Sequence, residues 1–193
     1  MFYKEFLSAV AIALTLVAFF PYIRSIIKNA VKPHVFSWVI WGMTTLVVFL
    51  AQLEDNGGAG AWPIGVSGCI TIFIALLAYL KRADITITKT DWLFFFAAIS
   101  ALPFWYFTSD PLWAVVILTT VDVLGFGPTV RKAYVLPHSE SLLFFALFTA
   151  RNLIVIMALE NYSVTTVLFP AAVAIACLLL MVMITYRRRT LAI

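Results

Sequence analysis

The sequence predicts an all-α integral membrane protein with seven transmembrane helices. Three observations predict this class: 64% of the 193 residues are hydrophobic, only 11% are charged, and the mean hydropathy is +1.05. A soluble domain carries about 25% charged residues, so this chain cannot cover its surface with polar groups. Its hydrophobic runs are continuous rather than alternating, which favours helices over the strands of a membrane barrel.

Seven segments reach or approach the roughly 20 residues that a helix needs to cross the hydrocarbon core of a bilayer. Short connections separate them and leave no room for a soluble catalytic domain. We expect the first helix to stay in the mature protein, because no small-residue cleavage site follows its apolar run. In chain order the segments are 6–24, 35–53, 61–80, 92–108, 112–130, 140–159 and 164–186.

Basic residues follow the first, third, fifth and seventh segments, whereas the alternate connections carry only acidic charges. This positive-inside pattern predicts an N-terminus outside and a C-terminus in the cytoplasm. The net charge of +4 then serves topology and anionic lipid heads, not nucleic acid. The acidic residues are Glu54, Asp55, Asp110 and Glu160. The basic residues are Arg24, Lys28, Lys32, Lys81, Arg82, Lys89, Arg131, Lys132, Arg187, Arg188 and Arg189.

The first three segments and the last three repeat each other. The pairs separated by 107 residues are Pro21 and Pro128, Arg24 and Arg131, Pro63 and Pro170, and Tyr79 and Tyr186. Between these pairs, Pro33-His34 and Pro137-His138 lie 104 residues apart, which implies a shorter connection in the second copy. A co-linear series across three consecutive segments favours internal duplication.

The fourth segment has no counterpart, and it explains how both copies acquire one topology. Three is an odd number of spans, so a copy that followed directly would insert upside down. We therefore expect two parallel three-helix repeats, residues 1–82 and 111–193, joined by an inverting linker helix in residues 83–110. Transporters with parallel repeats have this architecture.

The 3+1+3 arrangement resembles the SWEET and PQ-loop superfamily of membrane transporters. In that family a proline near the cytoplasmic end of helices 1 and 5 belongs to a Pro-Gln signature. The matching prolines here are Pro21 and Pro128, followed by Tyr22 and Thr129 in place of glutamine. The resemblance implies alternating access without a cofactor, with both prolines as hinges. A proline also bends a helix statically, so a fixed kink is the alternative.

The PnuC vitamin-precursor transporters are a second family with this layout. They carry a Trp-x-x-Trp motif near the substrate, and Trp38-Val39-Ile40-Trp41 reproduces that spacing in the second segment. Aromatic and polar residues continue at intervals of three and four along this face and along its copy in the sixth segment. Such faces suit a small-molecule pocket. The expected substrate-binding residues are Trp38, Trp41, Thr45, Gln52, Thr149, Arg151 and Asn152.

Two ionisable residues fall well inside the membrane: Asp122 in the fifth segment and Arg151 in the sixth. Charges at this depth are functional hypotheses by default. Their similar depth predicts an Asp122–Arg151 ion pair. Neither has a charged equivalent in the first copy, where Thr15 aligns with Asp122 and Val47 with Arg151.

Three interpretations of these two charges stay open. Asp122 couples substrate movement to protons, as the resemblance to lysosomal PQ-loop amino-acid carriers suggests. Alternatively, Arg151 holds a carboxylate or phosphate of the substrate, with Asp122 as its counter-charge in the empty state. The third interpretation is a structural ion pair, which can be neutral for stability and still damaging when broken.

The predicted function is therefore transport of a small organic solute by alternating access, in contact with membrane lipid. The SWEET sugar site uses asparagines in helices 3 and 7, which are absent here, so an amino acid-, nucleoside- or vitamin-like substrate is favoured over sugar. The alternatives are a SWEET-like sugar facilitator and a receptor without transport, as in the KDEL retrieval receptors. No metal, cofactor or nucleophile–base motif predicts an enzyme. The short connections favour a bacterial inner (plasma) membrane, and homo-oligomer formation stays open.

Overall fold

The computed structural model describes residues 2–29, 33, 35–81, 87, 89–135 and 137–191, and within these residues every regular element is a helix. The predicted topology residues Lys32 and Arg82, the repeat residue His34 and the boundary between residues 82 and 83 lie outside this part. The elements are α1 (Phe2–Ile27), α2 (Val35–Glu54), η1 (Gly58–Ala61), α3 (Trp62–Leu80), α4 (Lys89–Thr108), α5 (Pro111–Gly125), α6 (Gly127–Val135), η2 (Pro137–Ser139), α7 (Leu142–Ala158) and α8 (Val164–Leu191).

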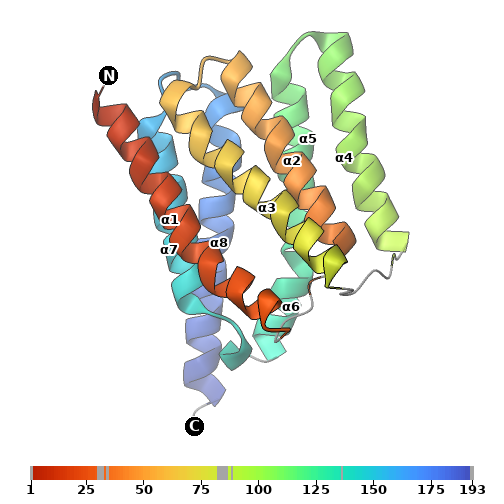
Figure 1. The fold of residues 1–193 in the computed structure, drawn as a ribbon, viewed down its shortest axis with the longest axis vertical. Helices are drawn as coiled ribbons and strands as arrows, with labels where there is room; N and C mark the ends of the chain where they lie inside the picture. The colour runs from red at the N-terminus through yellow and green to blue at the C-terminus, as the bar shows by residue number, and fades with distance from the viewer. Residues whose placement is uncertain are drawn as a thin grey trace.

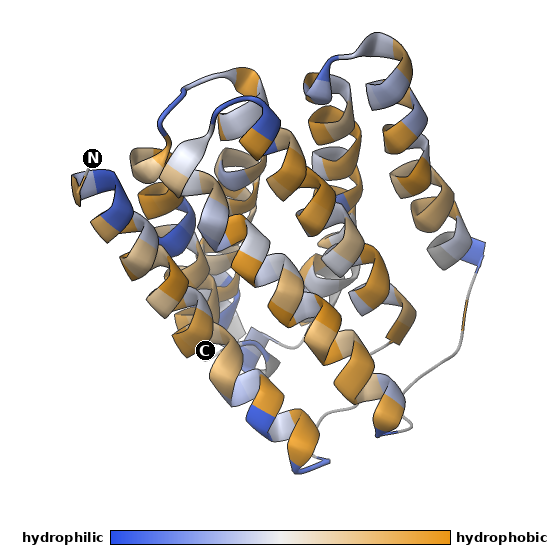
Figure 2. Cartoon of the chain, turned by 45° about the horizontal axis from the view of Figure 1, so that its top comes forward, coloured by the Kyte–Doolittle hydropathy of each residue, from blue (hydrophilic) through white to orange (hydrophobic). Residues whose placement is uncertain are grey.

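The helices have the length and composition of a membrane-embedded protein. Four stretches are long and apolar enough to cross a bilayer: Phe2–Ile27, Val35–Glu54, Gly58–Leu80 and Val164–Thr190. Three further apolar helices are shorter. Hydrophobic residues cover most of the helical surface, and hydrophilic ones concentrate near helix ends and connections (Figure 2). The helical membrane class predicted from composition is confirmed.

The helices pack in an order that differs from their order in the chain. α3 packs against both α1 and α2, and α8 packs against both α5 and α7. Two further interfaces join these groups, because α1 packs against α7 and α2 against α5. α4 lies at the edge of the molecule, beside α5 (Figure 1). The start of α1 and the end of α8 lie at opposite ends of the molecule.

α2 and α3 approach closely because glycines face the partner helix. A Cβ atom at Gly42 would lie 2.5 Å from Ile72 Cδ1, and one at Gly68 would lie 2.8 Å from Leu46 Cδ2. Small residues at such contacts let helices pack without space for lipid between them. α2 and α3 therefore form a closely packed pair.

The fifth predicted segment was expected to be one helix over 112–130, and this expectation is wrong. α5 ends at Gly125, Phe126 forms a turn, and α6 begins at Gly127. The reason is local: Gly125 and Gly127 are poor helix formers, and a proline such as Pro128 is favoured in a first turn. Pro21, its counterpart, lies inside α1, which continues to Ile27.

Candidate functional site

Arg151 is the centre of a buried polar cluster at the interface of α1 and α7. Its side chain is only 2% exposed. Nε donates to Thr15 Oγ1 at 3.1 Å, Nη1 to Asn152 Oδ1 at 2.9 Å, and Nη2 to the carbonyl oxygen of Pro63 at 2.6 Å. The three acceptors come from α1, α7 and the start of α3. The guanidinium group therefore ties together helices from both ends of the chain.

The partners of Arg151 are themselves held in place. The Thr15 hydroxyl donates to the Ala11 carbonyl at 2.8 Å, so its oxygen is presented to the guanidinium. Asn152 Nδ2 donates to the Phe148 carbonyl at 2.8 Å, which fixes Asn152 Oδ1 towards Arg151. The ring of Phe148 lies 5.9 Å from Arg151 Cζ, a distance at which an aromatic face attracts a cation.

The predicted Asp122–Arg151 ion pair is not formed. Among the described residues, Arg151 bonds neutral oxygens only, and Asp122 takes part in no hydrogen bond or salt bridge. The reason is the packing order: α8 lies between α5 and α7. The prediction treated helices that follow each other in the chain as neighbours in space.

Asp122 lies about one helical turn from a contact between α5 and α2. Gly125 follows it by three residues on the same face of α5, and a Cβ at Gly125 would lie 2.8 Å from Trp41 Nε1 on α2. Because α2 and α5 run in opposite directions, the residue of α2 one turn from Trp41 at this level is Thr45. Thr45 Oγ1 donates to the Trp41 carbonyl at 2.7 Å. Trp41 thus lies at the α2–α5 interface, and Thr45 and Asp122 each lie about one helical turn from this contact.

Trp38 belongs to an aromatic cluster rather than to the α2–α5 interface. Its ring stacks on Tyr22 with a centroid distance of 5.1 Å, and it meets Phe19 at 6.4 Å and Trp41 at 5.7 Å. Phe19 also contacts Phe148 of α7 at 5.4 Å. The cluster therefore joins α1, α2 and α7.

The aromatic cluster lies one helical turn from the polar residues on three helices. Phe19 follows Thr15 by four residues in α1, and residues four apart are neighbours along a helix face. In α7 and α2, which run the opposite way, Phe148 precedes Asn152 and Trp41 precedes Thr45 by the same interval. An aromatic layer thus lies next to a polar layer, on the side away from the start of α1. Sequence reasoning missed Thr15, Phe19 and Phe148 as site residues, although the predicted repeat aligned Thr15 with Asp122.

Three buried polar atoms of the described residues have no hydrogen-bond partner: Gln52 Oε1, Thr119 Oγ1 and Thr149 Oγ1. Gln52 is fully buried, and its Nε2 donates to the Thr166 carbonyl at 2.7 Å. A buried polar group without a partner costs about 1–3 kcal/mol. Of the predicted binding residues, Gln52 and Thr149 therefore keep unused hydrogen-bonding capacity, and Thr119 is an addition from α5.

Hydrogen bonds join the α2–α3 connection to the α7–α8 connection at the end where α1 begins (Figure 1). Asn161 Nδ2 donates to the Asp55 carbonyl at 2.9 Å, and Ser163 Oγ donates to Asp55 Oδ2. The Glu160 amide donates to the Gly57 carbonyl at 3.1 Å. We call this set, residues 55–60 with 159–163, the loop clasp.

Close backbone packing strengthens the loop clasp. A Cβ at Gly60 would lie 2.5 Å from the backbone nitrogen of Leu159, so no larger residue fits without movement. Gly58 has a φ of 60°, which glycine adopts at little cost. Lys4 Nζ of α1 donates to the Leu159 carbonyl at 2.6 Å. The clasp therefore also holds the start of α1.

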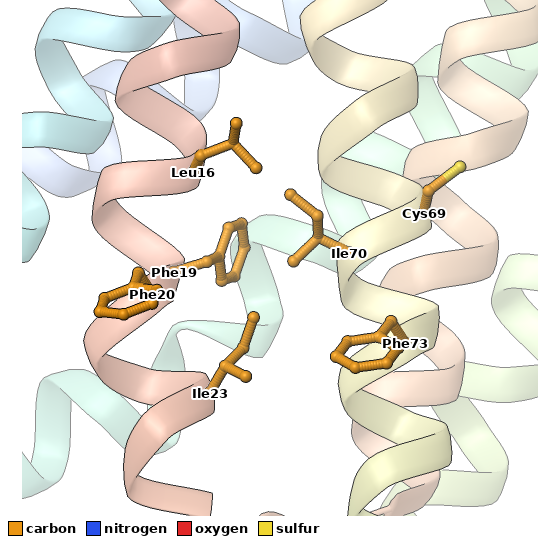
Figure 3. A pocket seen from close by; sticks show the side chains of 7 residues that line it. All are labelled: Leu16, Phe19, Phe20, Ile23, Cys69, Ile70 and Phe73. Atoms are coloured by element: carbon orange, nitrogen blue, oxygen red, sulfur yellow. The ribbon is translucent and has the colours of Figure 1, made fainter. Parts of the chain in front are cut away.

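A pocket of about 310 Å³ lies between α1 and α3 (Figure 3). Its lining is almost wholly apolar, so it offers little to a polar solute, and none of the predicted binding residues lines it. Phe19 contributes to both its wall and the aromatic cluster. The lining residues are Leu16, Phe19, Phe20, Ile23, Cys69, Ile70 and Phe73.

Comparison with known proteins gives no relative. No family model matches the chain, and neither the curated proteins nor the solved structures contain a significant match.

Proposed function

We propose that the protein is a membrane transporter that moves a small organic solute by alternating access. Seven spans are arranged as 3+1+3, with repeats in residues 1–82 and 111–193 and a linker helix in 83–110. The first repeat contributes α1, α2 and α3, and the second contributes α5, α7 and α8. Pro21 and the break before Pro128 are the proposed hinges.

The contact pattern supports the repeat. In each group the third helix packs between the other two: α3 between α1 and α2, and α8 between α5 and α7. An exchange of the two groups also converts the α1–α7 interface into the α5–α2 interface. Both of these interfaces exist. A two-fold relation between parallel repeats requires such exchanged contacts.

The observation that carries the proposed function is the buried polar layer between the two groups, closed on both sides. Arg151 donates a hydrogen bond to Thr15 across the junction and another to its neighbour Asn152. The loop clasp covers one side of this layer and the aromatic cluster covers the other. Polar and charged residues inside a membrane protein mark substrate or ion pathways. In the proposal this layer belongs to the solute pathway, and its closure on both sides corresponds to the occluded state of alternating access.

The connections between α2 and α3, α4 and α5, and α7 and α8 contain no Lys or Arg, which supports a topology with the N-terminus outside. Asp55, Asp110 and Glu160 all lie in connections at the end where α1 begins. The positive-inside rule assigns that end to the outside. The loop clasp would then close the pathway on the outer side, and the aromatic cluster would close it on the inner side. The proposed location is a bacterial inner membrane. Asp122 remains the candidate for proton coupling.

The test is solute exchange in proteoliposomes with a loop clasp that can be locked. The variant carries Asp55→Cys and Ser163→Cys in a Cys69→Ser, Cys177→Ala background, so that a short bifunctional thiol reagent with a reducible linkage can join the two connections. We expect saturable counterflow of a solute from an amino acid, nucleoside, vitamin and sugar panel. Cross-linking should stop this flux and reduction should restore it.

Variants with only one of the two new cysteines are the matched controls, and the reagent should leave their flux unchanged. Flux that continues in the cross-linked protein contradicts an outer closure at the clasp. Ligand binding without flux of any panel solute contradicts transport and favours the receptor alternative on the same fold.

A further inference from the structure

Arg151 is a buried cation without a buried anion among the described residues. It is 2% exposed, and its three bonded acceptors are a hydroxyl, an amide and a carbonyl oxygen. Burial of a charge is costly unless an opposite charge compensates it. A tie between α1 and α7 needs hydrogen bonds but no net charge. The positive charge therefore requires an explanation other than packing.

We propose that Arg151, with Thr15 and Asn152, forms a subsite for the carboxylate group of a small organic solute. This subsite rests on the proposed transport function, and it names the chemical class of the substrate. Arginine presents five N–H donors in a planar fork that matches a carboxylate. Three donors are engaged in the structure, one each from Nε, Nη1 and Nη2. One N–H on each terminal nitrogen remains for a ligand.

The charge balance favours a monoanion. One guanidinium compensates one negative charge, whereas a phosphate monoester carries up to two near neutral pH. The candidate anion of the protein, Asp122, lies on the far side of α8 and pairs with none of the described residues. Phe148 next to the guanidinium supplies an apolar wall for the body of the solute. A small carboxylate with an apolar or aromatic body fits these features.

The location of the subsite links binding to closure. Thr15 belongs to α1 of the first repeat, and Arg151 and Asn152 belong to α7 of the second. A carboxylate held by Arg151 adds an interaction across the α1–α7 interface and draws the two repeats together. When the repeats separate, the guanidinium becomes accessible and the solute can leave.

The test is thermal stability of the full-length protein in detergent, with carboxylates paired with their own amides. The probes are lactate with lactamide, benzoate with benzamide and nicotinate with nicotinamide, and inorganic phosphate is a separate arm. A ligand that binds only the folded state raises Tm. We expect at least one carboxylate to raise Tm in a saturable manner while its amide and phosphate do not.

Variants assign the effect to Arg151. Arg151→Gln should abolish the shift, and Arg151→Lys, which keeps the charge but loses the fork, should weaken the affinity about tenfold. Arg189→Gln removes an exposed cation near the end of α8 and should leave the shift unchanged. If Arg151→Gln does not fold, Arg151→Lys and Thr15→Val carry the test, because both keep the buried position filled.

Three outcomes overturn the subsite: equal shifts by a carboxylate and its amide, no shift by any carboxylate, or a full shift in Arg151→Gln. A shift by phosphate alone also overturns it, in favour of a phosphate site. Proteoliposome exchange separates this result from the proposed function. Exchange of neutral solutes alone would leave transport standing without the subsite. Arg151-dependent carboxylate binding without any exchange would leave the subsite standing in a receptor.

Discussion

The α1–α7 and α2–α5 interfaces are held together by different interactions. At α1–α7, Arg151 donates hydrogen bonds to Thr15 and to the Pro63 carbonyl. At α2–α5, Trp41 contacts Gly125, and Asp122 forms no hydrogen bond with the described residues. One interface thus has charge-assisted hydrogen bonds, and the other has van der Waals contact.

In the proposed repeat, the two copies differ in charge at these interfaces. In the repeat alignment Thr15 corresponds to Asp122 and Val47 to Arg151. At the α1–α7 interface, the cation Arg151 therefore lies opposite the Thr15 hydroxyl. In α5, the carboxylate of Asp122 occupies the position that aligns with Thr15. A single ion pair would have needed both charges at one interface. Because the two charges do not pair with each other, Arg151 is available to an anionic ligand and Asp122 to a proton.

The largest expected effect tests how firmly the α1–α7 side is closed. In Gly60→Ala the new methyl group would lie 2.5 Å from Leu159 N and 2.7 Å from Leu159 Cα. These are backbone atoms, so the loop clasp has to move. We expect a loss of about 3 kcal/mol in the free energy of unfolding, measured by denaturant titration in detergent micelles.

Gly127→Ala is the matched control for this substitution. A Cβ at Gly127 meets no atom within 4 Å, and alanine is the better helix former. We expect this variant to be neutral or up to about 1 kcal/mol more stable. Equal losses in both variants would mean that the clasp does not constrain Gly60.

The second prediction moves a carboxylate from one interface to the other. Thr15→Asp places an anion beside Arg151 Nε, where the burial of the cation is already part of the folded state. A charged acceptor strengthens the existing hydrogen bond, and we expect about 2 kcal/mol of added stability. The same variant should lose carboxylate binding, because its own side chain occupies the guanidinium. Thermal unfolding with and without benzoate measures both effects.

Thr15→Val is the control for the introduced charge. It has a similar shape to threonine but removes the acceptor of Arg151 Nε, so stability should fall by about 1–3 kcal/mol. A Thr15→Asp variant that is less stable than Thr15→Val would contradict the position of the guanidinium beside α1.

A smaller effect is expected at the α2–α5 interface. In Gly125→Ala the added methyl lies 2.8 Å from Trp41 Nε1, a side-chain atom that can shift. We expect a loss of about 1 kcal/mol together with a change in tryptophan emission, and Trp41→Phe should remove that emission change. A loss as large as that of Gly60→Ala would mean that both interfaces are equally rigid.

The sequence predicted the class of the fold and the positions of its helices, because continuous hydrophobic runs and turn residues are local signals. It did not predict the break at Phe126, where two flanking glycines and Pro128 end the helix within a continuous apolar run. Hydropathy does not register this event, since glycine is not polar. The helix propensities of Gly125 and Gly127 were the available signal.

The site was predicted less well, because its contacts depend on packing order. Arg151, Asn152 and Thr45 were identified as site residues from their type and depth. Thr15 and the Pro63 carbonyl were not, since no local pattern shows that α1 packs against α7. The predicted depth in the membrane put Asp122 level with Arg151. Depth does not show that α8 packs between α5 and α7. Every residue has a backbone carbonyl, so the sequence does not show which one accepts a hydrogen bond from an arginine.

The smallest expected effect addresses the two charges directly. In a double-mutant cycle with Asp122→Asn and Arg151→Gln, the energy of interaction between the two positions should lie below about 0.5 kcal/mol, because the side chains share no bond and α8 separates them. Asp122→Asn by itself should hardly change Tm, whereas Arg151→Gln loses three hydrogen bonds. The cycle uses four proteins unfolded under identical conditions. A coupling energy above about 1 kcal/mol would indicate a direct ion pair between the two side chains. Arg151 would then already be compensated by Asp122, which would contradict the carboxylate subsite.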